Sequence, residues 1–98
     1  MSVFTLFINK RAEVDIQNTI DYYDDITPGL GKKFEQALEK ELKTLALNPF
    51  YQVRYKTMRC KLIKKYPYLI HYTLNSQLKE IYVFAVICTH RNTKTNWL

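Results

Sequence analysis

The sequence predicts an α+β fold in which two helices precede most of a β-sheet. Apolar residues recur with a period of 3.6 up to Leu47, Asn48-Pro49 stops further helix, and from Tyr51 onward apolar residues alternate with a period of two. A hydrophobic fraction of 47%, with only two Gly and three Pro, is typical of an ordered globular chain. At 98 residues, we expect one domain spanning 1–98 with a single modest core.

The N-terminal part predicts a strand followed by a helical hairpin. The run 3–8 is rich in β-prone residues, and Asn9 is a suitable N-cap for a helix over 11–26. Thr27-Pro28-Gly29 ends that helix, and the apolar period then resumes to predict a second helix over 30–47. Because the connection is so short, we expect the two helices to be antiparallel neighbours, and their apolar faces should cover one face of a sheet.

After the hairpin we expect a mainly antiparallel set of three to four strands, so that the whole sheet has four or five. Over 51–63, tyrosines and apolar residues alternate with polar and cationic ones such as Arg59 and Lys61. Successive strand residues point to opposite faces, so this segment should have one apolar and one cationic face.

The two remaining strands are separated by a turn signal at 75–77. Apolar residues alternate over 68–74, which predicts a strand with one buried face. The run 81–89 is apolar on both faces, which is typical of a strand inside the sheet with helices on one side.

The charges are sorted along the chain. Residues 1–41 carry eight acidic and five basic residues, a net charge of −3, whereas residues 42–98 carry ten basic residues and one acidic residue, a net charge of +9. Charges farther apart than about 8 Å are screened from one another at physiological salt, so each region keeps its own field. Tyrosines are interleaved with the basic residues between 51 and 82, as in surfaces that bind phosphates and bases. A basic face that serves only solubility is the alternative.

The sequence argues against membrane insertion, secretion and a zinc site. The longest wholly apolar stretch, 83–88, is too short to span a bilayer, and 1–10 lacks the features of a signal peptide, so we expect a cytoplasmic protein. Cys60 and Cys88 lack metal-ligand spacing, which favours reduced thiols in strands. We expect no cofactor and no metal.

A series of short motifs occurs in a characteristic order around the strands. They are Asn48-Pro49, Arg54-Tyr55, Arg59, Tyr66-Pro67-Tyr68, Ile70, Tyr72 and Arg91-Asn92. In this order, and after a strand and a helical hairpin, they resemble the RelE/ParE superfamily of toxins from type II toxin-antitoxin modules, also called plasmid stabilisation proteins. The resemblance covers nearly the whole chain.

The resemblance implies a toxin that inhibits growth until a cognate antitoxin neutralises it in a hetero-oligomer. RelE-like members cut messenger RNA in the ribosomal A site, whereas ParE-like members poison DNA gyrase without a hydrolytic site. RelE-like members usually carry a Tyr or His in the last segment, where this chain ends in Thr95-Asn96-Trp97-Leu98, and many relatives have His at the position of Cys88. We therefore favour the ParE-like mode, with the RelE-like endonuclease as the alternative.

A cationic patch is the predicted functional site. Strand alternation places Arg59 and Lys61 on one face, and Arg91 follows the last strand closely enough to reach over it. In a nuclease, Arg59 and Arg91 would stabilise charge on the phosphate, and His90 would shuttle a proton. The expected binding residues are Arg54, Lys56, Arg59, Lys61 and Arg91.

His71 offers a second imidazole within a predicted strand. It would serve as a proton shuttle in a nuclease, but a lone His on a strand is more often a hydrogen-bonded structural residue.

A different class of function needs no nucleic acid. The basic surface could instead receive the acidic, partly disordered tail of an antitoxin, in which case the protein is a non-toxic binding module. In either class we expect a partner peptide or helix that covers the basic sheet surface and adds a strand or lies across the helical hairpin.

Overall fold

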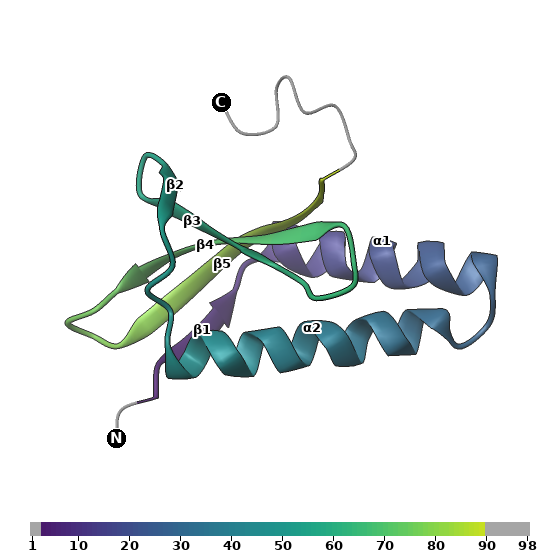
Figure 1. The fold of residues 1–98 in the computed structure, drawn as a ribbon, viewed down its shortest axis with the longest axis horizontal. Coiled ribbons are helices and arrows are strands. Elements are labelled where there is room, and N and C mark those ends of the chain that lie inside the picture. Colours follow the sequence, from purple (N-terminus) through teal and green to yellow (C-terminus); the bar gives the residue numbers. More distant parts are fainter. Residues whose placement is uncertain (1–2, 90–98) are drawn as a thin grey trace.

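The computed structural model describes residues 3–89, and its elements follow the predicted order (Figure 1). One sheet has the strand order β1-β5-β4-β3-β2, in which β1 is parallel to β5 and the other pairs are antiparallel. The predicted α+β fold is therefore confirmed. The elements are β1 (Thr5–Ile8), α1 (Lys10–Ile26), α2 (Leu30–Leu47), β2 (Val53–Tyr55), β3 (Met58–Leu62), β4 (Tyr68–Asn75) and β5 (Glu80–Cys88).

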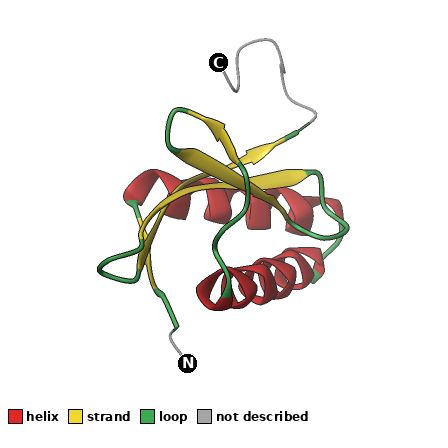
Figure 2. Cartoon of the chain, turned by 60° about the vertical axis from the view of Figure 1, so that its left-hand side comes forward, coloured by secondary structure: helices red, strands yellow, loops and turns green. Residues whose placement is uncertain are grey.

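Both helices lie on the same side of the sheet, as the apolar periodicity predicts (Figure 2). The core forms between this helix layer and one face of β4 and β5, and Phe34 and Leu45 of α2 are fully buried in it. Within residues 3–89, neither helix is long and apolar enough to cross a membrane. The sheet residues of the core are Tyr68, Ile70, Tyr72, Ile81, Val83 and Val86.

Strand β5 contains a β-bulge at Phe84. On one side of it Tyr72 pairs with Val83, and on the other His71 pairs with Ala85, so Phe84 is an extra residue without a partner in β4. A bulge reverses which alternate residues face the core. Accordingly Val83 and Val86 are both buried against the helices although they are three residues apart. The bulge gives a physical reason for the apolar run on both faces of this strand, which is interior as predicted.

Side chains cap the start of each helix. At the start of α1, Oδ1 of Asn9 accepts from the N–H of Ala12 at 2.9 Å. The N-cap of α2 is Gly29, which has no side chain, and Asp24 of α1 replaces the missing cap: its Oδ1 accepts from the N–H groups of Gly29 at 3.2 Å and of Gly31 at 2.8 Å. A carboxylate at this position also complements the helix dipole.

Gly31 is required where the two helices approach each other. A Cβ atom added there would lie 2.6 Å from the carbonyl oxygen of Ile20 and 2.8 Å from the carboxylate of Asp24. Movement of a side chain cannot relieve the contact with Ile20, because that contact is with backbone.

We predict that Gly31→Ala destabilises the protein by about 1–3 kcal/mol, because the added methyl group overpacks the helix contact. The measurement is chemical denaturation followed by circular dichroism. Lys33→Ala, on the exposed side of the same helix, is the matched control and should stay within about 0.5 kcal/mol of wild type. Equal stability of both variants would contradict this account of the hairpin.

Candidate functional site

Arg59 and Lys61 lie on the helix side of the sheet. Arg59 pairs with Tyr72 and Lys61 with Ile70, and directly opposed residues share a face. The register therefore puts Arg59 and Lys61 on the same face of β3. That face is directed toward the helices, however, and both side chains are half-buried.

Arg59 fixes the connection between α2 and β2. Its guanidinium donates to the carbonyl oxygen of Tyr51 and lies 6.0 Å from the ring centroid of Phe50. The buried hydroxyl of Tyr72 donates to the carbonyl oxygen of Pro49 at 2.8 Å, and burial raises the pKa of Tyr72 to about 12. Arg59 therefore has structural partners in the segment that follows α2.

Lys61 pairs with a buried carboxylate of α2. Its Nζ lies 3.1 Å from Oε1 of Glu41, and the N–H of Lys64 donates to Oε2 of the same residue at 3.1 Å. Lys61 also lies 5.2 Å from the ring centroid of Tyr51. Glu41 is 8% exposed, so these contacts compensate a carboxylate that interrupts the apolar face of α2.

The other predicted site residues are placed differently. Arg54 and Lys56 are exposed in the β2–β3 hairpin. The charge of Arg54 lowers the pKa of His71 and counteracts the burial that raises the pKa of Cys60. His90 and Arg91 lie outside the described residues, so their place in a cationic patch stays a prediction.

The sheet face opposite the helices, here called the outer face, is aromatic rather than cationic. Phe7 stacks on Tyr82 with ring centroids 5.6 Å apart, and Phe7 and Phe84 are 45% and 39% exposed. Tyr68 and Tyr72, by contrast, are buried on the helix side. The expected surface of interleaved tyrosines and cations is therefore divided between the two faces. The outer face includes Phe7, Cys60, His71, Thr73, Tyr82 and Ala85, placed by strand register.

His71 is the centre of a polar cluster on the outer face. Its Nδ1 lies 3.0 Å from the hydroxyl of Tyr55 and 3.5 Å from Sγ of Cys60, and the residue is 1% exposed. Burial lowers the pKa of His71 to about 4, and the charges of Arg11 and Arg54 act in the same direction. His71 is thus neutral at neutral pH. The interpretation of a hydrogen-bonded, largely structural histidine fits this geometry.

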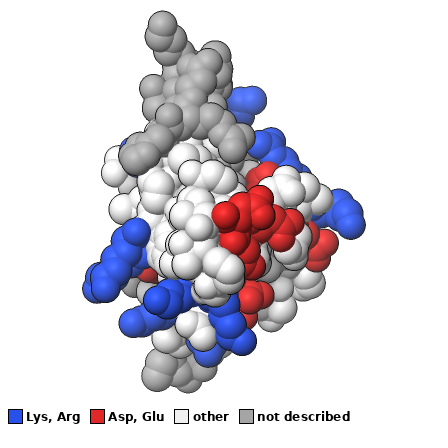
Figure 3. Space-filling model, turned by 90° about the vertical axis from the view of Figure 1, so that its right-hand side faces the viewer, with Lys and Arg blue, Asp and Glu red and all other residues white. Residues whose placement is uncertain are grey.

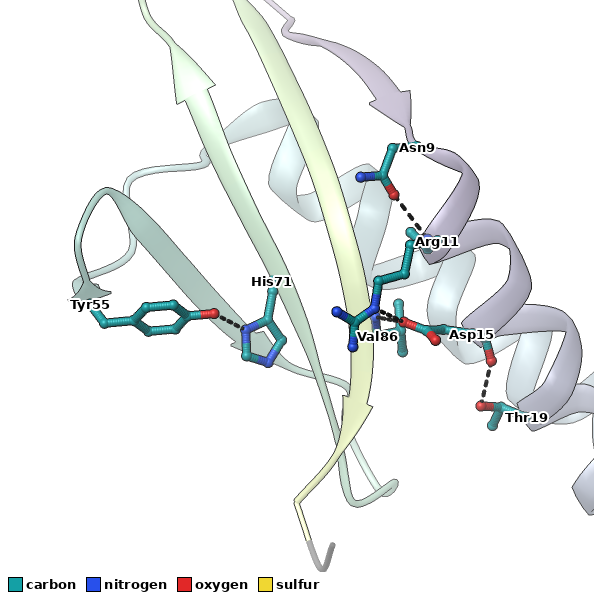
Figure 4. Close-up of polar contacts among 8 residues, drawn as sticks. Asn9, Arg11, Asp15, Thr19, Tyr55, His71 and Val86 are labelled. Atoms are coloured by element: carbon teal, nitrogen blue, oxygen red, sulfur yellow. Dashed lines mark hydrogen bonds and ion pairs between the residues drawn. The ribbon is translucent and has the colours of Figure 1, made fainter. Parts of the chain in front are cut away.

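A groove of about 460 Å³ lies between α1 and the end of β5. The N–H of Val86 donates to Oδ2 of Asp15 at 3.0 Å, and Arg11 lies 3.7 Å from the same carboxylate (Figure 4). Asp15 therefore supplies the acceptor that a neighbouring strand would provide, because β1 ends its pairing with β5 at Val83. The groove is lined by Arg11, Asp15, Asn18, Thr19, Tyr22, Tyr23, Pro67, Tyr68, Val86, Ile87 and Cys88.

Sequence reasoning missed the roles of Arg11, Asp15 and Tyr55. Figure 4 shows Tyr55 directed at His71, while Arg11 and Asp15 lie together at the start of α1. Asp15 follows Arg11 by four residues, which is the spacing of a helical ion pair, but no sequence pattern connects Asp15 to Val86. Figure 3 shows the molecule from the end of the helical hairpin, where acidic side chains gather. This agrees with the net negative charge of residues 1–41.

The fold is thus a helical hairpin packed on one face of a five-stranded mixed sheet. No protein-family model and no curated protein matches the chain. Among solved structures, it is similar to a chain described as "Chromosomal ParDE TA system from P. aeruginosa", with a TM-score of 0.76 and 17% sequence identity over 90% of this chain and 98% of the other. The expected RelE/ParE-like fold is therefore confirmed.

We predict that the free energy of unfolding falls by about 3 kcal/mol as the pH drops from 6.5 to 4, through His71 alone. The unfolded histidine binds a proton near pH 6.5, whereas the folded one resists protonation until about pH 4, so acid favours unfolding. Denaturation of wild type and His71→Gln across this range measures the effect. Parallel pH profiles for the two proteins would contradict it.

We also predict that Lys61→Ala costs about 1–3 kcal/mol, because it leaves the carboxylate of Glu41 without its cationic partner. Lys56→Ala, in the exposed hairpin, is the control and should change stability by less than about 0.5 kcal/mol. In a Glu41→Gln background the cost of Lys61→Ala should shrink. An undiminished cost in that background would show that the pair is not its cause.

Proposed function

We propose that this protein is the toxin of a type II toxin-antitoxin module and is neutralised by a cognate antitoxin. The observation that carries the proposal is the fold shared with a chain of a ParDE toxin-antitoxin system over nearly its whole length. The resemblance of the motifs around β2 to β5 to the RelE/ParE superfamily supports it independently. A cytoplasmic location agrees with such a role.

We favour a ParE-like, non-hydrolytic mode with DNA gyrase as the target. The support comes from His71, one of only two histidines in the chain, which is buried, neutral at neutral pH and hydrogen-bonded to Tyr55. A buried histidine with a pKa of about 4 is poorly suited to take a proton from a ribose hydroxyl at the surface. Arg59 and Lys61 have structural partners as well, which reduces the cations ready to meet a phosphate.

The RelE-like endonuclease is the second candidate. The exposed Arg54 and Lys56 support it, together with Arg59 and with the predicted contributions of His90 and Arg91. In that mode the arginines would stabilise the negative charge that develops on the pentacoordinate phosphorus.

An antitoxin has a suitable surface in the outer face. Its exposed Phe7 and Phe84 and the stacked Tyr82 offer apolar area of the kind that a partner peptide or helix covers. The sequence predicts a partner on the basic face of Arg59 and Lys61; because that face is directed toward the helices, we expect instead a mainly apolar contact on the outer face. A chain that binds this partner and inhibits nothing would be the non-toxic binding module.

We predict that induced expression in a bacterial host arrests growth and causes gyrase-linked DNA breaks, and that co-expression with the adjacent reading frame restores growth. The measurements are colony counts, DNA breaks and mapped RNA ends on ribosomes. RNA cuts at A-site codons would instead establish the RelE-like mode, and Arg91→Ala should then lower the cleavage rate by about a hundredfold. Normal growth despite soluble expression would contradict toxicity.

Two arginine variants separate function from folding in the same experiment. Arg54→Ala is exposed and should fold normally, so any loss of toxicity reports a lost contact with the target. Arg59→Ala also removes the bond to Tyr51, so its stability must be measured alongside its toxicity. Lys32→Ala, exposed on α2, is the neutral control.

A further inference from the structure

The four most exposed large apolar side chains within residues 3–89 gather at one end of the molecule, where the N-terminal segment, the end of α2 and the β4–β5 turn meet (Figure 1). Backbone hydrogen bonds join these three segments. The N–H of Phe4 donates to the carbonyl oxygen of Ala46, and the N–H of Thr5 to that of Lys79, both at 2.8 Å. Exposed apolar side chains gathered in this way mark an interaction site. This surface, here called the end patch, consists of Val3, Leu47, Phe50 and Leu78, each 58–64% exposed.

Phe50 is a rigid anchor within the end patch, although it lies in the connection between α2 and β2. The carbonyl oxygens of the residues on either side of it accept hydrogen bonds from Tyr72 and Arg59. Its ring packs edge-on against that of Phe4, with centroids 5.8 Å apart. An exposed aromatic ring on a backbone that is already fixed loses little entropy when a partner covers it, which is typical of the residues that dominate an interface.

Cations surround the end patch. Nζ of Lys79 lies 5.3 Å from the ring centroid of Phe4. The guanidinium of Arg59 lies 6.0 Å from that of Phe50. Lys43 is exposed one helical turn before the end of α2. The end patch is therefore an apolar surface with a positive rim, and it is complementary to apolar side chains that are flanked by carboxylates.

Lys79 holds its charge at a strained backbone position. Its φ of 58° lies in the left-handed region, which Gly adopts more readily than a residue with a long side chain. The carboxylate of the adjacent Glu80 accepts from the hydroxyl of Tyr82 and is engaged there. Because Gly would relieve the backbone, the folded state gains nothing from Lys at this turn that Gly would not supply. A role of the charge in binding accounts for Lys here.

The end patch and the outer face can be covered by different partners. Leu47 ends α2, and Phe50 packs against Phe4 of the core, so both belong to the helix side of the sheet. A partner on the outer face leaves these two side chains uncovered. A toxin of the proposed kind has two partners, an antitoxin and a target, and the outer face is assigned above to the antitoxin.

We propose that the end patch binds an acidic amphipathic segment of the protein that this toxin inhibits. The inference rests on the proposed function and adds to it a separate surface for the target. Phe50 and Leu47 contact the apolar side chains of that segment, and its carboxylates pair with the positive rim formed by Lys43, Lys79 and Arg59.

The test compares growth arrest, antitoxin capture and binding to purified bacterial DNA gyrase for Leu47→Ser and Phe50→Ser. We expect both variants to relieve the arrest, to bind gyrase at least about tenfold more weakly, and to capture the antitoxin as wild type does. Ile26→Ser is the matched control, since Ile26 is 57% exposed at the opposite end of the hairpin, and it should keep the arrest. Phe84→Ser, on the outer face, should weaken antitoxin capture.

Lys79→Gly separates binding from folding. It removes the charge and relieves the backbone, so we expect unchanged or higher stability together with about two- to fivefold weaker binding to gyrase, most evident at low salt. Because Phe50 packs on the core, circular dichroism checks the folding of its variant, and Leu47→Ser and Lys79→Gly carry the test if that variant unfolds.

Several outcomes would overturn the end patch as the target surface. Full arrest by Leu47→Ser and Phe50→Ser would do so, and so would a loss of antitoxin capture in Leu47→Ser, which would assign the patch to the antitoxin. Self-association of wild type that Phe50→Ser abolishes would assign it to a second copy of the chain. Binding to phosphatidylserine vesicles in place of gyrase would assign it to a membrane surface. Normal growth with wild type would instead refute the proposed function, which distinguishes the two failures.

Discussion

The pairing of β4 with β5, interrupted by the extra residue Phe84, is the constraint on which the other contacts depend. It decides which side chains of β5 face the helices, first Val83 and then Val86, while β3 pairs with the other edge of β4 in a register of its own. That register directs Arg59 and Lys61 toward the helices and leaves Cys60 beside His71. Without the bulge, one half of β5 would direct its apolar residues away from the helices.

The two faces of the sheet differ in chemistry. On the helix side, cations are held by a backbone carbonyl and by the buried carboxylate of Glu41, so they stabilise the junction of α2 with the sheet. The outer face offers aromatic side chains and a neutral polar cluster around His71. A partner that recognises the outer face therefore meets mainly apolar area, with Arg54 as a cation whose charge reaches the cluster.

Much of the fold could be predicted because the local signals agree with the tertiary structure. The predicted helices, 11–26 and 30–47, match α1 and α2 to within one residue, since Asn9, Pro28 and Pro49 mark their limits chemically. The orientation of the strands was harder. Alternation shows that Arg59 and Cys60 lie on opposite faces, but it does not show which face is directed toward the helices. The larger number of apolar residues on the Cys60 side indicates that this side faces the helices, whereas in the structure the Arg59 side does. Tertiary partners such as Glu41 and Tyr51 settle that choice, and they are remote in sequence.

The parallel pairing of β1 with β5 has a consequence for the order of folding during synthesis. Thr5 pairs with Glu80, so the first strand to leave the ribosome cannot be paired until the last strand of the sheet follows it. The helical hairpin needs only the chain up to Leu47 and is held by local contacts, which form early. Translation products that stop before Glu80 therefore lack β5, and they leave β1 and β4 without the strand that joins them in the sheet.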